Sequence, residues 1–340
     1  MTGPAVAPAM GLNLHSHLEG SVRPSTAAEL AESLRIPTPA EGWEAALHMR
    51  DPGTLTALLV HVAHAYSLFR SPEAIYRLVR EAVEDATLDG QAFLELRFGP
   101  ATHASPSVPL HTVVDAASTG LRDASREMGM PAGLVVCALR HHDPDTNREV
   151  AQAAAAFAGR GVVGFDVAGD ELLFPSLEPM REPFAIASAA GLGLTAHAAE
   201  AGPASAARDA VELLGVARIG HGSRVADDPE LLRWAADAGI CIEVCPTSNI
   251  LTGAAPSHKR HPVRAFVDAG CRVVVGDDDP TTTGSRLSAE IAGLGERVGL
   301  DASQVAAIHA TSLDVAFADG STRAAIRARL VPDAARAGGA

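Results

Sequence analysis

The sequence of 340 residues predicts an α/β fold, a (β/α)8 barrel of the TIM type with additional helices inserted between strands 1 and 2. Short apolar runs rich in β-branched residues recur along the chain, and longer Ala-, Leu- and Glu-rich stretches with helical spacing follow them. This alternation is typical of a parallel sheet, and eight strands close a barrel. The predicted strands lie within residues 11–20, 91–100, 132–141, 161–171, 192–200, 216–222, 239–249 and 271–280.

The segments between these runs carry helix-start signals. Ser71-Pro72 and Asp228-Pro229 each precede a helical pattern that ends at a glycine. The segment from about 25 to 90 is too long for one crossover, so we expect several helices there that cover one end of the barrel as a lid or pocket wall. Since no repeat or linker marks a boundary, we predict a single domain over residues 1–340, with flexible ends at 1–10 and 331–340.

Composition narrows the classes of partner. Hydrophobic residues make up 47% of the chain and charged residues 20%, which is ordinary for a globular protein. The formal net charge of −14 disfavours binding to nucleic acid. Cys137, Cys241, Cys245 and Cys271 lie in apolar surroundings that predict buried, reduced thiols on strands. Because no signal peptide or membrane-spanning run is present, we expect a cytoplasmic protein without a membrane partner.

Polar residues follow the predicted strands at their carboxyl ends, where barrel enzymes house catalysis. His15 and His17 are two apart on the first strand, so both imidazoles can point toward one ion. Such a pair alone is more often structural. His197 ends the fifth strand, and Asp278 or Asp279 ends the eighth. Three imidazoles and a carboxylate suit zinc, although the same ligands could hold another divalent ion.

Two further residues would complete an acid/base set. Glu200 follows His197 by three residues, and His221 stands between two glycines at the end of the sixth strand. A carboxylic acid in an apolar site can hold a proton for a substrate nitrogen, and an imidazole can accept a proton from a metal-bound water or orient it. Alone, either residue has a structural alternative, as a helix cap or as a filler of a glycine-made gap. Together with the ligand set they predict a hydrolase.

The motifs HSHLEGSVRP, LELRFGP, VVGFDVAGDE, TAHAAE, RIGHG, EVCPTSNILTG and GDDDP, in this order from about residue 12 to 320, resemble the adenosine deaminase family of the amidohydrolase superfamily. The resemblance implies one zinc ion per chain. The implied ligands are His15, His17, His197 and Asp278, and the implied catalytic residues are Glu200 and His221. The implied substrate-binding residues are Asp279 at purine N7, Gly169 through its backbone, Glu19 near the ribose hydroxyls, and His17.

The resemblance also implies a reaction on a small-molecule purine nucleoside. Zinc-bound hydroxide would attack C6 while Glu200 protonates N1 and His221 assists, and adenosine or deoxyadenosine would yield inosine or its deoxy form plus ammonia. Three positions depart from the common pattern: Ala199 replaces Gly, Asp277 replaces a small hydroxylated residue, and Glu19 replaces Asp. Adenine and aminofutalosine therefore stay open as substrates, and the sequence leaves the oligomeric state open.

Three other classes of protein are compatible with parts of this pattern. His17-Leu18-Glu19 matches the H-x-E of cytidine-type deaminases, but those enzymes also need P-C-x-x-C, and Cys241 and Cys245 have three residues between them. A different amidohydrolase of the same fold, cleaving a lactam, ester or phosphoester, is a second alternative. A non-catalytic binding protein stabilised by zinc is the third. Glu200 and His221 favour an enzyme, because a structural zinc site has no use for an acid and a base.

Overall fold

The computed structural model describes residues 11–330, which build an eight-stranded parallel sheet in the order β1 to β8. The strands are Gly11–His17 (β1), Gln91–Phe98 (β2), Ala132–Leu139 (β3), Val162–Ala168 (β4), Gly193–Ala198 (β5), Arg218–His221 (β6), Cys241–Val244 (β7) and Arg272–Val275 (β8). The chain after β8 returns to β1, where Asp278 N–H donates to His15 O at 3.0 Å and His17 N–H to Asp278 O at 2.6 Å. The predicted (β/α)8 barrel is confirmed, and each strand falls inside its predicted run.

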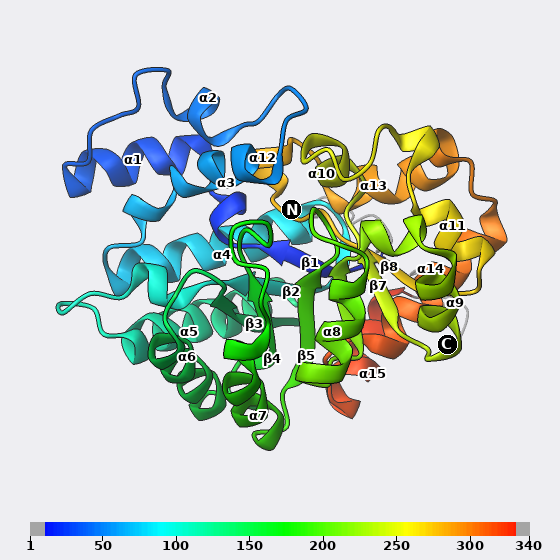
Figure 1. Ribbon diagram of the computed structural model, residues 1–340. Helices are drawn as coiled ribbons and strands as arrows, with labels where there is room; N and C mark the ends of the chain where they lie inside the picture. The colour runs from blue at the N-terminus through cyan, green and yellow to red at the C-terminus, as the bar shows by residue number, and fades with distance from the viewer. Residues whose placement is uncertain (1–10, 331–340) are drawn as a thin grey trace, which may run out of the picture.

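Helices surround the barrel in the predicted alternation (Figure 1). They are Leu110–Met128 (α5), Pro144–Ala156 (α6), Arg181–Ala189 (α7), Ser205–Leu214 (α8), Pro229–Asp237 (α9), Pro246–Leu251 (α10), Val263–Asp268 (α11), Pro280–Thr283 (α12), Leu287–Gly293 (α13), Ala302–Val315 (α14) and Gly320–Leu330 (α15). The start predicted at Pro229 is confirmed, because the Asp228 side chain accepts hydrogen bonds from the N–H groups of Glu230 and Leu231.

The insertion between β1 and β2 holds four α-helices, as expected: Pro24–Leu34 (α1), Trp43–Leu47 (α2), Leu55–Ala63 (α3) and Pro72–Leu88 (α4). In Figure 1 the first three lie together on one side of the strands, with α3 beside α12. Two backbone hydrogen bonds hold them there, from Met49 N–H to Thr282 O at 2.9 Å and from Gly53 N–H to Leu251 O at 2.7 Å. The insertion thus covers the end of the barrel where the strands finish.

The strands of the barrel wall are largely buried. Every residue of β2 is buried, which matches strands covered on both faces in a parallel sheet. The four cysteines are free and buried, as predicted, but only Cys137 and Cys241 lie on strands, while Cys245 follows β7 and Cys271 precedes β8. None of the helices within residues 11–330 is long and apolar enough to span a membrane. The predicted flexible ends, 1–10 and 331–340, lie outside the described residues.

Candidate active site

The predicted ligand residues meet at the carboxyl end of the barrel. One nitrogen or oxygen from each of His15, His197, His221 and Asp278 lies within 4.8 Å of the others. His17 belongs to the same cluster, since its Nε2 lies 3.2 Å from His197 Nε2 and 3.4 Å from Asp278 Oδ1. Nitrogens this close, together with a buried His15 Nε2 that none of the described residues hydrogen-bonds, fit a shared cation. The residues of this cluster can hold one metal ion.

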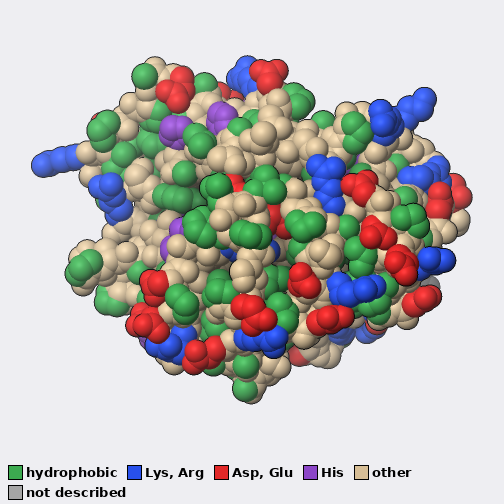
Figure 2. All heavy atoms as spheres, in the orientation of Figure 1, with side chains coloured by type: hydrophobic (Ala, Val, Ile, Leu, Met, Phe, Trp, Pro, Cys, Tyr) green, Lys and Arg blue, Asp and Glu red, His purple; other side chains and the backbone are tan. Residues whose placement is uncertain are grey.

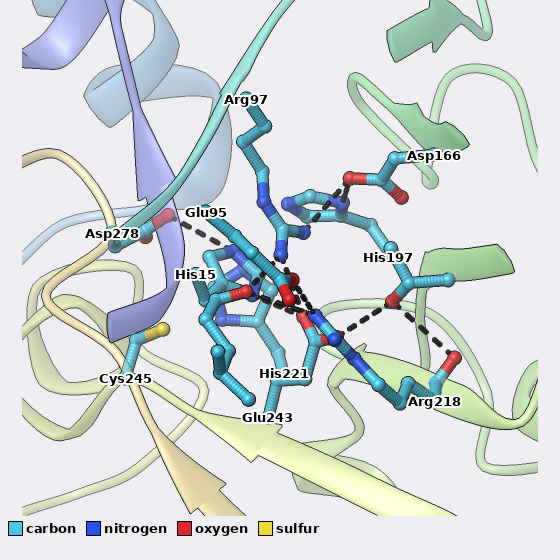
Figure 3. Close-up of polar contacts among 12 residues, drawn as sticks. His15, Glu95, Arg97, Asp166, His197, Arg218, His221, Glu243, Cys245 and Asp278 are labelled. Carbon is cyan, nitrogen blue, oxygen red and sulfur yellow. Dashed lines mark hydrogen bonds and ion pairs between the residues drawn. The ribbon is translucent and has the colours of Figure 1, made fainter. Parts of the chain in front are cut away.

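Carboxylates from the barrel interior orient two of these imidazoles (Figure 3). His15 Nδ1 lies 2.8 Å from Glu243 Oε2, so the Nδ1 proton is donated there and the Nε2 lone pair is left for the cluster. His197 Nδ1 lies 3.0 Å from Asp166 Oδ2. A carboxylate behind a ligating histidine fixes the ring and its tautomer and strengthens it as a ligand. Both contacts therefore prepare the rings to bind a cation through Nε2.

A buried ion network lies beneath the cluster. Arg97 donates to Asp166 Oδ2 and Glu243 Oε2, both at 2.9 Å. Arg218 donates to Glu243 Oε1 at 2.6 Å and Glu95 Oε2 at 2.7 Å. All five side chains are at most 1% exposed. Since buried charges are tolerated only when paired and hydrogen-bonded, the network fixes Glu243 and Asp166, and through them the two imidazoles.

Strained backbone concentrates at the same place. Within residues 11–330, four non-glycine residues have a positive φ, and three of them are Ala199 (56°), His221 (62°) and Asp278 (62°). Such conformations cost free energy and persist where the surrounding structure enforces them. At Ala199 the strain explains why a Gly is common at this position in the family that the sequence resembles.

Glu200 is buried, with its Oε2 3.7 Å from His221 Nε2. Thr252 Oγ1 donates a hydrogen bond of 2.9 Å to its other oxygen. Burial, with the nearby carboxylates of Asp278 and Glu171, raises the pKa of Glu200 to about 8. At neutral pH the carboxyl group therefore keeps its proton, as a general acid requires.

Glu171 holds the loop that carries Glu200. Its carboxylate accepts hydrogen bonds from the backbone N–H groups of Ala199 at 3.0 Å, Ala201, and Gly202 at 2.7 Å. A Cβ at position 202 would lie 2.9 Å from Glu171 Oε2, so this close approach needs a glycine. One buried side chain thus satisfies three backbone donors around the acid.

Glu171→Gln is expected to lower kcat by about 10-fold or more and the free energy of unfolding by about 1–3 kcal/mol. The NH2 group of the new amide would replace a carboxylate oxygen that accepts hydrogen bonds, so backbone N–H donors would face another donor. Turnover and urea denaturation measure the two effects. Glu178→Gln, an exposed change in a surface pair with Arg181, is the control. Wild-type kcat in Glu171→Gln would show that the Glu200 loop holds its shape without this carboxylate.

A cavity of about 350 Å³ opens above the cluster and contains Glu200, His221, Asp278 and His17. The residues that line it are mainly aliphatic and aromatic. Many of them belong to α3 or to the loop after β4, including Leu58, Leu173 and Phe174. On the face of the molecule drawn in Figure 2, hydrophobic side chains gather near the centre. The insertion thus forms a pocket wall, as predicted, and a flat apolar ring fits between such walls.

The predicted substrate-binding residues also line this cavity. Asp279 is buried, and its Oδ1 has no hydrogen-bond partner among residues 11–330; Gly169 has a φ of 105° that favours glycine. Gly20 gives Asp279 room, since a Cβ there would lie 1.9 Å from Asp279 Oδ1. Glu19 is partly engaged already, because its Oε1 accepts hydrogen bonds from Gly99 N–H at 3.0 Å and faces His103 Nε2 at 2.9 Å.

Asp277 does not line this cavity. It is buried in the wall of a second cavity, of about 280 Å³, which also borders α4. Its Oδ1 has no hydrogen-bond partner within the described part of the chain. Of the three departures from the family pattern, Glu19 therefore lies against the main cavity, Ala199 lies in the Glu200 loop, and Asp277 lies behind the strand ends.

Several residues of the site were missed in the sequence. They are Glu95, Arg97, Asp166, Glu171, Arg218, Glu243 and His103, together with Asn249, which contacts His221, and His261, which contacts Asn249. A charged residue inside an otherwise apolar predicted strand was the available signal for those on β2, β4, β6 and β7, because such a charge is buried only with a partner. His103, Asn249 and His261 lie on short loops or helices, where no periodic pattern sets them apart.

The comparison with known families supplies the identity. The model of the family described as adenosine deaminase matches residues 11–332. The chain belongs to the adenosine deaminase family. It is a hydrolase of the kind that acts on the amidine C–N bond of a purine. The resemblance seen in the motifs is thereby confirmed.

Relatives within the family differ in their substrate. An adenosine deaminase of Enterococcus faecalis is 32% identical over 82% of this chain and 83% of its own. An adenine deaminase of a Chelativorans species is 33% identical over 94% of this chain and 97% of its own. Among solved structures, an amidohydrolase from Burkholderia ambifaria with bound zinc has a TM-score of 0.85 and 28% identity, covering 94% of this chain and 89% of that one.

Proposed function

We propose that this member of the family deaminates adenosine and deoxyadenosine, with zinc held by His15, His17, His197 and Asp278. The observation that carries the proposal is the buried carboxyl group of Glu200, which lies beside the cluster of His15, His197, His221 and Asp278 and lines the same mostly apolar cavity. A bound zinc ion would supply Lewis acidity that lowers the pKa of a water molecule. Binding of the purine and movement of its protons fall to side chains and backbone groups of this chain.

These side chains orient the purine and move its protons. In the proposed pose Asp279 hydrogen-bonds purine N7 and the backbone of Gly169 contacts the ring, which places N1 at Glu200. Glu200 donates its proton to N1, so the negative charge that develops when C6 becomes tetrahedral is neutralised on the ring. His221 belongs to the cluster and its Nε2 lies 3.7 Å from Glu200 Oε2, so it can contact the attacking oxygen. The apolar walls exclude bulk water from this exchange.

The lining of the cavity favours a nucleoside or base over a nucleotide. None of the described residues around it is Lys or Arg, whereas Glu19, Asp170, Glu200, Asp278 and Asp279 are acidic. A phosphate group would meet carboxylates without a cationic partner, which is unfavourable in a partly buried site. Glu19 has one oxygen left for a sugar hydroxyl, since Gly99 and His103 occupy the other. This free acceptor favours adenosine over adenine.

The test is ammonia release, with the accompanying ultraviolet change, from zinc-loaded protein offered adenosine, deoxyadenosine, adenine, aminofutalosine and AMP. We expect turnover of the two nucleosides and none of AMP. Preference for adenine or aminofutalosine would still support a deaminase of 6-aminopurines, but it would contradict the role proposed for Glu19 in favouring adenosine. Zinc at one per chain without turnover of any of the five would favour the non-catalytic alternative and contradict the proposal.

The pKa of Glu200 predicts the alkaline limb of the pH profile. Because the acid is active when protonated, kcat/KM is expected to fall as the pH rises through about 8. Thr252 donates to the Glu200 carboxylate and so stabilises its ionised form. Thr252→Val is therefore expected to move this limb to higher pH, which a kcat/KM profile measures. An unchanged limb in Thr252→Val would assign it to another group.

A further inference from the structure

A chain of hydrogen bonds leads away from His221 toward the outside of the barrel. His221 Nδ1 lies 3.0 Å from Asn249 Nδ2, and Asn249 Oδ1 lies 3.2 Å from His261 Nε2. His261 Nδ1 in turn receives the backbone N–H of Val263 at 3.1 Å. His221, Asn249 and His261 are all at most 3% exposed, so water has little access to these bonds. Asn249 belongs to α10, and His261 precedes α11.

The donor and the acceptor of each hydrogen bond follow from the contacts of His261, which lies at the outer end of this chain of bonds. A backbone N–H can only donate, so Nδ1 of His261 is an acceptor and carries no proton. His261 is then a neutral ring with its proton on Nε2, consistent with burial, which lowers its pKa to about 3. Its Nε2–H donates to Asn249 Oδ1. The identity of that oxygen has independent support, because the backbone N–H of Cys245 also points to it at 3.4 Å.

The orientation of the Asn249 amide determines that Nδ1 of His221 accepts a hydrogen bond. With its oxygen facing two donors, Asn249 presents its NH2 group to His221 Nδ1, which must accept. An imidazolium has no lone pair to accept with, so a ring that accepts at Nδ1 is neutral. A neutral imidazole that accepts at Nδ1 carries its proton on Nε2. That Nε2 is the atom 3.7 Å from Glu200 Oε2 at the edge of the ligand cluster.

We propose that Asn249 and His261 are positioning residues that hold His221 with its proton on Nε2, so that His221 acts as a hydrogen-bond donor and neither ligates the metal nor accepts a proton. The inference rests on the proposed function for its chemical meaning. It decides between two readings of the cluster, because His221 and His17 both lie within reach of His197 and Asp278. A protonated Nε2 has no lone pair for a cation, which leaves His17 as the third imidazole ligand.

The donor has a use in the reaction. An Nε2–H beside the cluster can donate a hydrogen bond to the oxygen that attacks C6. This hydrogen bond occupies one lone pair of the attacking oxygen and so orients the oxygen toward the purine. A fixed donor needs no reorganisation during the reaction, whereas a histidine free to exchange tautomers would present the wrong nitrogen part of the time. Loss of the relay is therefore expected to lower kcat about 10–100-fold with little change in KM.

The test observes the tautomer directly. Full-length, zinc-loaded protein labelled with ¹⁵N-histidine is measured by NMR, and the His221 ring signals are identified by their loss in His221→Gln. We expect the shifts of a neutral ring protonated at Nε2. A proton on Nδ1, or the signature of a metal-bound Nε2, would overturn the proposal. This readout needs no substrate, so it separates the proposal from a failure of the deaminase assignment.

Substitutions in the relay test its cause. In Asn249→Asp the carboxylate can only accept, so the proton of His221 is expected on Nδ1 and kcat is expected to fall. Asn147→Asp is the matched control, a buried amide that binds backbone groups of β3 and its loop. His261→Phe removes the outer donor and is expected to give mixed tautomers, whereas His261→Gln retains a donor and is expected to restore the wild-type pattern. Unchanged His221 shifts in both Asn249→Asp and His261→Phe would refute the relay.

Discussion

Glu200→Gln is expected to lower kcat by about 10²–10⁴-fold, the range for loss of a positioned general acid. The amide has nearly the shape of the acid and can still receive the Thr252 hydrogen bond through its oxygen. It has no acidic proton for purine N1, so charge would build up on the ring as C6 becomes tetrahedral. KM and zinc content are expected to stay near those of the wild type, because Glu200 is not among the proposed ligands.

A matched control separates chemistry from burial. Glu290 is also buried, has a pKa raised by burial, and does not line the cavity. Glu290→Gln therefore makes the same chemical change in a similar environment and is expected to keep wild-type kcat. Steady-state ammonia release and zinc analysis of the two variants make the comparison. Near-normal kcat in Glu200→Gln would show that another group protonates the ring.

Glu243→Gln is expected to lower the free energy of unfolding by about 3–5 kcal/mol, the usual cost of leaving a buried charge without its partner. The Glu243 carboxylate accepts hydrogen bonds from His15, Arg97, Arg218 and the hydroxyl of Thr195, all within 2.9 Å. A neutral amide can accept from only some of these donors, and its NH2 group would face an arginine. Urea denaturation of zinc-loaded protein measures this loss.

The same variant is expected to weaken zinc binding by about 10–100-fold, because His15 loses the carboxylate that orients it. Competition with a chelator gives the affinity. If Glu243→Gln does not fold, Asp166→Asn tests whether a carboxylate orients His197 for zinc. Asp166 contacts the His197 ring and pairs with Arg97. Unaltered zinc affinity in Asp166→Asn would mean that packing alone orients the imidazole.

The sequence predicted the ligand candidates for a physical reason. In a parallel barrel all strands end at one face, so His15, His197 and Asp278 at the ends of three predicted strands had to lie near one another. Glu200 and His221 followed from the same rule. Strand position alone did not show which of His17 and His221 a cation would use, since that depends on ring tautomers that neighbours set.

The supporting residues required the tertiary structure. Glu243, Arg97 and Arg218 come from β7, β2 and β6, and only closure of the barrel reveals that one carboxylate serves both arginines and His15. His261 reaches His221 through Asn249 from a loop with no pattern of its own. Pairings between distant segments leave little trace in one sequence, because each residue type also occurs at unpaired surface positions.

The sequence by itself determined the barrel, its eight strand positions, the helical insertion and the family, because apolar periodicity and strand-end motifs are local properties of the chain. The tertiary structure alone decided the protonation of Glu200, the orientation of His15 and His197, and the direction of the bonds that reach His221. These properties depend on burial and on the charges and donors that other strands bring within hydrogen-bond distance, and both arise only when the chain has folded.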